Sequence, residues 1–358
     1  MGLDIAGLRN LKSQKITPGA QGNSLFGANG AGKTSVLEAI YLLSTGRSFR
    51  ATSFDVAIAY DQPRAVVSAV VANDGMEYRL GVERRRDGST HARLDGLDLN
   101  STSSLAQQLP CHLLDANTIE VVVGAPKARR QLLDWGVFHV EHGFAALARR
   151  FRGVLGQRNA LLQQLLNRGD DAQLQFWDSR FSELALQVHD CRARYVASLI
   201  PEFARVLDAL DAPPVEVGYR PGWAQDRPLA EVLLSSRDSE RSVGRTLYGP
   251  HRADLRLTSM RRALPQALSR GQQKVVAYAL VLAQIRLELQ ASGRAPVVLV
   301  DDLLSELDGH HARRVIEALR QLGVQYFVTA IDNNDWAATD DPILAFHVEQ
   351  GMIYPTHS

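Results

Sequence analysis

The chain has 358 residues, and 45% of them are hydrophobic, which is enough for a large core in two domains or in one domain with an insertion. Forty basic and 39 acidic residues leave a net charge of +1, so any binding to nucleic acid must come from local patches. Two cysteines, Cys111 and Cys191, are too few for a disulfide framework, and no apolar run approaches a membrane span, so we expect a soluble cytoplasmic protein without a membrane partner.

The first informative segment is the octapeptide at residues 27–34, Gly-Ala-Asn-Gly-Ala-Gly-Lys-Thr, which fits the phosphate-binding P-loop pattern. A short strand is predicted before it, at residues 21–26, and apolar residues at helical spacing follow it. Glycine backbones at a helix N-terminus suit phosphate oxygens, Lys33 supplies positive charge, and the Thr34 hydroxyl suits Mg²⁺. The predicted nucleotide-binding residues are Gly27, Ala28, Asn29, Gly30, Ala31, Gly32, Lys33, Thr34 and Ser35. The alternative is a glycine-rich surface turn.

A helical hairpin is predicted in the middle of the chain. Apolar residues mark one face of a helix between Gly143 and Asn167, and a stop and turn follow at residues 167–171. A second helix carries a heptad seam, made by Leu174, Trp177, Phe181, Leu184, Val188, Cys191 and Tyr195. We expect an antiparallel pair of helices, with Pro201 bending or restarting the second helix and residues 212–214 ending the helical region.

A second anion-binding helix N-terminus is predicted near residue 269. Ser269, Arg270, Gly271 and Gln272 come directly before a strongly helical run over residues 274–289. This S-x-G-Q pattern is weak evidence by itself. Its place in the chain, between the P-loop and a strand that ends in acids, makes it specific.

Two carboxylates end a predicted buried strand over residues 297–302. In P-loop proteins the first acid of such a strand holds Mg²⁺, and we assign that role to Asp301 together with Thr34. Asp302 is placed to orient or deprotonate a water molecule, and with Lys33 it makes up the predicted catalytic set. The alternative is that the two acids cap the following helix.

These motifs, in this order, resemble the ABC-type ATPases. The resemblance implies that Ser269 and its neighbours complete the nucleotide site of a second subunit, so that two ATP molecules lie in a two-fold dimer. It also implies a D-loop role for Asp308 and a γ-phosphate sensor at Thr329, the end of a predicted strand over residues 326–329. Ser269 follows Thr34 by 235 positions (269 − 34), a longer separation than in transporter nucleotide subunits and far shorter than long SMC-type arms need.

Four further segments closely resemble the RecF family. They are residues 46–50 (Gly-Arg-Ser-Phe-Arg), residues 122–136 (Val-Val-Gly-Ala-Pro running on to Asp-Trp-Gly), residues 248–254 (Tyr-Gly-Pro-His-Arg-Ala-Asp) and residues 303–308 (Leu-Leu-Ser-Glu-Leu-Asp). The likeness runs from residue 8 to about residue 329. It implies an α/β fold: a P-loop ABC-type ATPase head formed from both chain ends, with an inserted α-helical arm domain. We place the head at residues 1–108 and 215–358 and the arm at residues 109–214.

The resemblance to RecF also implies a function. It implies a protein of recombinational repair and replication that dimerises with ATP and Mg²⁺ on gapped or duplex DNA and assists RecA loading with RecO and RecR. Two features depart from the family pattern. Leu132 stands where an aromatic residue is usual, and no clear glutamine is present to ligate Mg²⁺, although residues 115–117 (Asp-Ala-Asn) lie near that region.

Hydrolysis is expected to be weak, stimulated by DNA and switch-like. Many transporter subunits carry Glu where Asp302 stands, and the Asp carboxylate is set back by roughly 1.5 Å, one C–C bond. A displacement near 1 Å can cost on the order of 100-fold in rate. Two other functions stay open. One is an energising subunit of a membrane transporter, which the arm and Asp302 argue against; the other is a scaffold that binds nucleotide without turnover, which two intact acids argue against.

Local basic clusters are the candidate DNA contacts, because contacts to phosphate need only local charge. Arg47 and Arg50 follow the P-loop helix and could touch DNA or the partner's nucleotide, and Arg129 and Arg130 lie in a family segment. The further clusters are Arg84, Arg85 and Arg86, and Arg149, Arg150 and Arg152. The alternative for each is a solvated face or a structural ion pair, and for Arg129 and Arg130 a link between arm and head.

Overall fold

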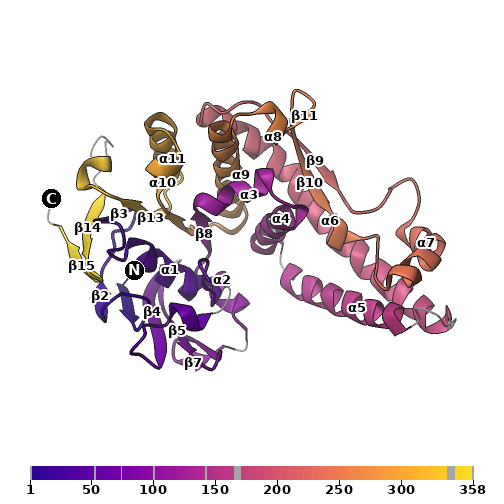
Figure 1. Ribbon diagram of the computed structural model, residues 1–358, viewed down its shortest axis with the longest axis horizontal. Helices are drawn as coiled ribbons and strands as arrows, with labels where there is room; N and C mark the ends of the chain where they lie inside the picture. The colour runs from indigo at the N-terminus through magenta and orange to yellow at the C-terminus, as the bar shows by residue number, and fades with distance from the viewer. Residues whose placement is uncertain are drawn as a thin grey trace. The chain divides into compact units, whose positions relative to one another are not determined.

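The computed structural model describes residues 2–51, 54–73, 75–99, 101–141, 143–164, 171–336 and 343–356. The chain forms two compact units (Figure 1). The first, here called the sheet unit, comprises Met1–Thr118, Ala209–Asp211 and Tyr278–Ser358. The second, the helical unit, comprises Ile119–Asp208 and Ala212–Ala277. The predicted α/β fold, with a middle segment inserted between two chain ends, is confirmed.

A mostly parallel sheet in the sheet unit carries the P-loop. Its strand order is β15-β14-β3-β13-β12-β8, and only β15 runs antiparallel to its neighbour. The strands are β3 (Gly22–Phe26), β8 (Cys111–Leu114), β12 (Val297–Val300), β13 (Gln325–Ala330), β14 (Leu344–Glu349) and β15 (Met352–Pro355). All four residues of β12 are buried, as its continuous apolar run predicts. Because β3 pairs with β13 and β14, both chain ends build one sheet.

A second, antiparallel sheet completes the core of the sheet unit. Its strands are β1 (Gly2–Ala6), β2 (Gln14–Ile16), β4 (Arg64–Asn73), β5 (Met76–Arg85), β6 (Thr90–Leu94) and β7 (Leu97–Asp98). The helix α1 (Lys33–Thr45) packs against β4 and β5 of this sheet and against β8 and β13 of the other. Of the apolar face predicted after the P-loop, Val36, Leu37, Ile40 and Leu43 are fully buried there, and Tyr41 is partly buried. The short helix α2 (Ser103–Gln108) also packs on α1.

The helical unit contains the predicted hairpin. Its helices are α3 (Glu120–Val123), α4 (Pro126–Val140), α5 (Phe144–Gln164), α6 (Asp171–Ala209), α7 (Leu229–Val243) and α8 (Leu264–Ala267). Leu162 packs against Leu174, and the rings of Phe151 and Phe181 lie 5.4 Å apart, so α5 and α6 run antiparallel. The predicted turn falls at residues 165–170, outside the described residues. Pro201 neither ends nor restarts the second helix, since α6 continues through it to Ala209.

A small antiparallel sheet follows the hairpin, with strand order β11-β10-β9. The strands are β9 (Glu216–Arg220), β10 (Asp254–Ser259) and β11 (Arg262–Ala263). These strands pair with one another and pack with α4 and α8, so the structure groups residues 212–277 with the helical unit. The sequence-based division assigned every residue from 215 onward to the head, and it stays a prediction about domains.

The remaining helices follow in the C-terminal part: α9 (Arg270–Ser292), α10 (Leu303–Glu306) and α11 (Gly309–Gln321). By length and composition alone α9 could cross a membrane, which the sequence analysis did not foresee. In the protein, 72% of its most apolar window is buried, as expected for the core helix of a globular protein.

Candidate functional site

Glycines shape the loop between β3 and α1. Gly27 adopts φ 145°, and a Cβ there would lie 2.2 Å from the Val348 carbonyl oxygen, so only glycine lets β14 approach so closely. Gly30 adopts φ 81° and has open space where a side chain would stand. The loop therefore turns tightly and keeps its inner face clear, as a phosphate-binding loop requires.

Lys33 is the first residue of α1 and is only 6% exposed. Its ammonium group donates to the carbonyl oxygens of Gly27, at 2.6 Å, and of Ala28, at 3.1 Å. Within the part of the chain that the structure describes, no carboxylate accepts a hydrogen bond from it. A buried positive charge without a counter-ion favours an anion in the loop.

Thr34 and the acids after β12 meet at the carboxyl edge of the parallel sheet. The Thr34 and Thr329 hydroxyls donate to Asp301 Oδ1, at 3.1 and 3.0 Å. Burial raises the pKa of Asp301, although the hydrogen bond from Thr329 opposes this, and the charge of Asp302 raises it further. A partly compensated carboxylate beside a hydroxyl suits a hard cation such as Mg²⁺. The described residues contain no group of three His, Cys, Asp or Glu that could hold a metal alone, so phosphate and water would supply the other ligands.

Asp302 occupies the N-cap position of α10 with φ 50°, in the left-handed region. Its backbone N–H donates to the Thr329 hydroxyl at 2.8 Å. Its carboxylate makes no capping hydrogen bond, and it lines the pocket beside the P-loop. The position agrees with the capping alternative, but the side chain is left available for the site.

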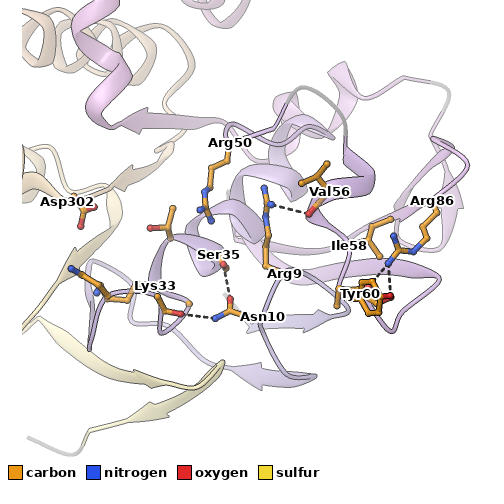
Figure 2. Close-up of a pocket in the computed structure, with 15 residues that line it drawn as sticks. Arg9, Asn10, Lys33, Ser35, Arg50, Val56, Ile58, Tyr60, Arg86 and Asp302 are labelled. Carbon is orange, nitrogen blue, oxygen red and sulfur yellow. Dashed lines mark hydrogen bonds between the residues drawn. The ribbon is translucent and has the colours of Figure 1, made fainter.

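The pocket has a volume of about 780 Å³, and residues far apart in sequence line it (Figure 2). Asn10 donates to the Gly30 carbonyl at 3.0 Å and accepts from Ser35 at 3.2 Å. Arg9 donates twice, both at 2.8 Å, to Glu38 on α1, whose side chain is fully buried. The sequence analysis did not single out Arg9 or Asn10 as site residues, although the segment that contains them marks the start of the RecF likeness.

Glu38, which pairs with Arg9, also contacts the segment that follows α1. The Ser48 hydroxyl donates to it at 2.5 Å, and the guanidinium group of Arg50 lies 3.8 Å away. Arg50 also lines the P-loop pocket of its own chain, and its contact with DNA or with the partner's nucleotide stays a prediction. Arg47 has an exposed side chain with no partner among the described residues.

The far end of the pocket has a different chemistry (Figure 2). Val56, Ile58 and a fully exposed Tyr60 line it together with Arg86. Arg86 donates to the carbonyl oxygens of Ala59 and Tyr60, at 2.7 and 3.0 Å. The sequence predicted Arg86 only as a possible DNA contact, and nothing local marks Val56, Ile58 or Tyr60 as site residues. Arg86 follows β5, and its contacts with Ala59 and Tyr60 join segments that are distant in sequence.

The signature residues lie in the helical unit, at the N-terminus of α9. The Ser269 N–H donates to the Gln272 side chain at 2.9 Å, and the Gln272 N–H donates to the Ser269 hydroxyl at 3.4 Å. This reciprocal pair is a capping box. Ser269, Arg270, Gly271 and Gln272 are all exposed, so the helix end faces solvent.

Asp308 and Thr329 both have partners within the sheet unit. The Asp308 carboxylate caps α11 by accepting from the N–H groups of His310 and His311, and it contacts the His311 ring at 2.7 Å. Hydrogen bonds from His311 lower the pKa of Asp308 to about 2. Thr329 is 2% exposed, and its hydroxyl contacts both acids of the site. Their D-loop and sensor roles stay predictions.

Some of the predicted basic clusters contact other residues of the protein, whereas one, within the described ranges, is exposed without such contacts. Arg129 forms a two-pronged pair with Asp254, at 2.7 and 3.2 Å, and Arg130 donates to the Ala253 carbonyl at 2.9 Å. Those contacts support the structural alternative for this pair of arginines. Arg85 pairs with Glu83 at 2.6 Å, and Arg84 donates to Thr90. Arg149, Arg150 and Arg152 are exposed on α5 and have no partner among the described residues.

Residues 115–117 lie near the region where the family pattern would place a Mg²⁺-binding glutamine, and they form a compact turn. Asp115 follows β8, and its carboxylate accepts from the Asn117 N–H and the Thr118 hydroxyl, at 3.0 and 3.1 Å. Its charge adds to the rise in the pKa of Asp301, behind burial and Asp302. Asp115 therefore lies at the edge of the sheet that holds the two acids.

Comparisons with known proteins agree with this arrangement. The chain matches the family model described as RecF/RecN/SMC N terminal domain over residues 1–354. It is 41% identical to the DNA replication and repair protein RecF of Stutzerimonas stutzeri (strain A1501), over 99% of this chain and 97% of the relative. It is also 41% identical to the protein of the same name from Pseudomonas putida (strain GB-1), again over 99% and 97%.

Two kinds of solved structure share the fold. One is described as "Structure of the recombination mediator protein RecF-ATP in RecFOR pathway", with a TM-score of 0.89 and 24% identity over 99% of this chain and 97% of that chain. Another is an Smc head bound to the C-terminal winged-helix domain of ScpA, with a TM-score of 0.60 and 16% identity over 99% and 96%. Because the family model and the 41% identical relatives both cover nearly the whole chain, the chain belongs to the RecF/RecN/SMC N-terminal-domain family and, within it, to the RecF proteins.

Proposed function

We propose that this protein is an ATP-dependent DNA-binding protein of recombinational repair and replication. Its relatives are named as DNA replication and repair proteins, and a related structure is a recombination mediator of the RecFOR pathway. The observation that carries the proposal is the charge of Lys33, which is buried in a glycine loop and has no carboxylate partner among the described residues. A triphosphate supplies the missing negative charge.

ATP would lie along the whole pocket. Its phosphates fit residues 27–35, and its nucleoside fits the far end, where an exposed Tyr60 ring and two aliphatic side chains can contact a base. Thr34 and Asp301 would hold Mg²⁺, which neutralises phosphate charge when bound. Asn10 supports the loop through the Gly30 carbonyl, and Arg9 holds Glu38 on α1.

Asp302 would orient or deprotonate the attacking water. Its carboxylate is uncommitted and faces the pocket, while Thr329 fixes its backbone. A short Asp at this position predicts slow turnover. We further propose that DNA stimulates this weak hydrolysis and that hydrolysis releases the protein from DNA. ATP hydrolysis thus acts as a switch.

Ser269 and its neighbours would contact the ATP of a second copy. They form an exposed, capped helix N-terminus, which suits phosphate. Two such copies bind two ATP molecules in an isologous dimer, and ATP therefore stabilises the dimer by mass action. We further propose gapped or duplex DNA, RecR, RecO and RecA as partners, and the cytoplasm as location, from membership of the RecF family.

Binding of a fluorescent duplex, measured by anisotropy with ATP, with ADP and with neither, tests this function. We expect ATP to strengthen binding, and Lys33→Met to abolish both ATP binding and that increase. Lys15→Met is the matched control, because Lys15 is an exposed lysine on β2 outside the pocket. Equal DNA affinity with and without ATP in the unmodified protein would refute the proposal.

A further inference from the structure

The helical unit contains a second pocket, lined only by residues of that unit and distinct from the P-loop pocket. Its volume is about 550 Å³. The end of β9 and the loop after it form one wall, and the segment from Arg252 to Asp254 forms another. Two of the segments that resemble the RecF family, residues 122–136 and 248–254, contribute Pro126, Arg252 and Asp254 to its lining, but no step of the proposed ATP switch uses this pocket.

Glycines hold the two walls close together. Gly222 adopts φ 99°, and a Cβ there would lie 2.2 Å from the Gly249 carbonyl oxygen and 2.9 Å from the Arg252 carbonyl carbon. The Gly249 N–H donates back to the Gly222 carbonyl at 3.2 Å. No other residue type fits this contact. The pocket is thus preformed, which lowers the entropy cost of binding.

Two aromatic residues, Tyr219 and Trp223, line the pocket, and both contact the ring of His189. The Tyr219 ring stacks on His189, with ring centroids 5.7 Å apart and planes 15° apart. The Trp223 ring packs edge-on against the same imidazole, with ring centroids 5.2 Å apart and an interplanar angle of 69°. The Gln225 amide lies 3.0 Å from His189 Nε2. Pro126 and Pro221 complete the apolar lining.

Two arginines line the rim without partners. The side chains of Arg220 and Arg252 are exposed, and neither makes a hydrogen bond or ion pair with any described residue. The carboxylate of Asp254, which faces the same pocket, is already paired with Arg129 at 2.7 Å. Burial lowers the pKa of Arg130; the charges of Arg192 and Arg252 lower it further, and those of Asp254 and Asp134 oppose this.

We propose that this pocket binds a carboxylate-bearing peptide segment of a partner protein. Arg220 and Arg252 would hold the carboxylate, since guanidinium groups match its geometry, and the rings of Tyr219 and Trp223 would contact an adjacent apolar side chain. DNA fits less well. A phosphate backbone needs a row of cations, whereas this pocket offers two arginines beside the carboxylate of Asp254.

Fluorescence anisotropy with a labelled peptide of repeating Asp-Asp-Phe-Pro units tests the proposal, with the same peptide carrying Asn in place of Asp as the reference. We expect the full-length protein to bind the acidic peptide and not the Asn peptide. Arg220→Glu and Arg252→Glu should each weaken binding by about tenfold or more. Arg245→Glu is the control, since it makes the same charge change at an exposed residue of the same unit outside the pocket.

ATP affinity, measured on the same variants, should not change, so failure here is distinguishable from failure of the ATP switch. It also shows that the variants are folded. Three results would overturn the proposal: no binding of the acidic peptide, equal binding of the Asn peptide, or equal affinity in Arg220→Glu and Arg245→Glu. A single-stranded oligonucleotide that binds where the peptide does not, and that is lost in Arg220→Glu, would make the pocket a nucleic-acid site instead.

Discussion

At the scale of single residues, one hydroxyl group connects the two acids of the site. Thr329 donates its only hydroxyl proton to Asp301 and accepts the N–H of Asp302, which stands in a left-handed conformation. A non-glycine residue at positive φ persists only where its surroundings hold it, and such residues concentrate at functional sites. Thr329 is therefore a positioning residue for both acids in addition to its predicted sensor role.

Thr329→Val keeps the side-chain shape and removes both hydrogen bonds. We expect ATP affinity to stay within about threefold, because Lys33 and the loop are untouched. Hydrolysis should slow by on the order of 100-fold, as a small displacement of the catalytic carboxylate predicts. Single-turnover hydrolysis measures this, with Thr329→Ser as the control that retains the hydroxyl. A valine variant as fast as the unmodified protein would exclude the positioning role.

His251 should make the stability of the helical unit depend on pH. Burial lowers its pKa from 6.5 to about 4, and the charges of Arg252, Arg130 and Arg158 contribute. Because the folded state binds this proton more weakly than the unfolded state does, the stability that neutral His251 contributes is present above pH 6.5. It is lost as the pH falls toward 4.

The free energy of unfolding should fall by on the order of 3 kcal/mol in total as His251 becomes protonated. His251→Gln removes the titration and can still donate to the Thr246 carbonyl, as the imidazole does at 3.1 Å. Urea unfolding at pH 7.5 and at pH 4.5 should show a smaller decrease for Gln than for His. Parallel decreases in the two proteins would show that His251 does not titrate on unfolding.

At the scale of elements, one buried arginine connects three helices of the helical unit. Arg158 on α5 is fully buried and donates to Asp178 on α6 at 2.9 Å, to Glu240 on α7 at 2.6 Å and to Thr246 at 2.8 Å. Three helices therefore share one cation. Its removal would leave two buried carboxylates without their main partner, although Arg237 still contacts Asp178.

Arg158→Met should destabilise the protein by about 3–5 kcal/mol, the cost of breaking a buried ion pair from one side. Arg152→Met, on the exposed side of the same helix, should change the free energy of unfolding by less than about 0.5 kcal/mol. Urea unfolding followed by tryptophan fluorescence compares the two. Equal stability of the two variants would contradict this account of the arm.

The N-terminus of α9 combines a cap with a predicted phosphate contact, and one substitution separates the two. Ser269→Asp keeps an oxygen acceptor for the Gln272 N–H, so helix stability should be retained. The added negative charge should repel a partner's phosphate and abolish ATP-dependent dimerisation, while ATP affinity of the monomer is unchanged. Light scattering and nucleotide titration measure both. Normal dimerisation by this variant would rule out the contact.

Local patterns account for what could be predicted from sequence. The P-loop, β12 and the α5–α6 hairpin each follow from residue spacing within one segment, and the structure contains all three. The antiparallel sheet was not predicted, although apolar residues alternate with other residues along β5 from Met76 to Val82. The pairing of Arg129 with Asp254, and the contact of Arg9 with Glu38, depend on distant partners that spacing does not reveal.

At the scale of the whole molecule, the residues proposed for the ATP site belong to two compact units. The P-loop, both acids and Thr329 belong to the sheet unit, whereas Ser269 belongs to the helical unit. In the proposed dimer each copy supplies the loop and acids of one site and the signature residues of the other. In that proposed arrangement dimerisation would depend on ATP, and hydrolysis would end it.

The most direct measurement is the mass of the protein in solution, by light scattering or sedimentation, when saturated with a non-hydrolysable ATP analogue and Mg²⁺ in the presence of duplex DNA. The account predicts that protein mass in the complex rises to twice 39.4 kDa, and that it stays at 39.4 kDa with ADP or with Lys33→Met. A protein that stays monomeric at micromolar concentration with the analogue bound, with or without DNA, would contradict the shared ATP site.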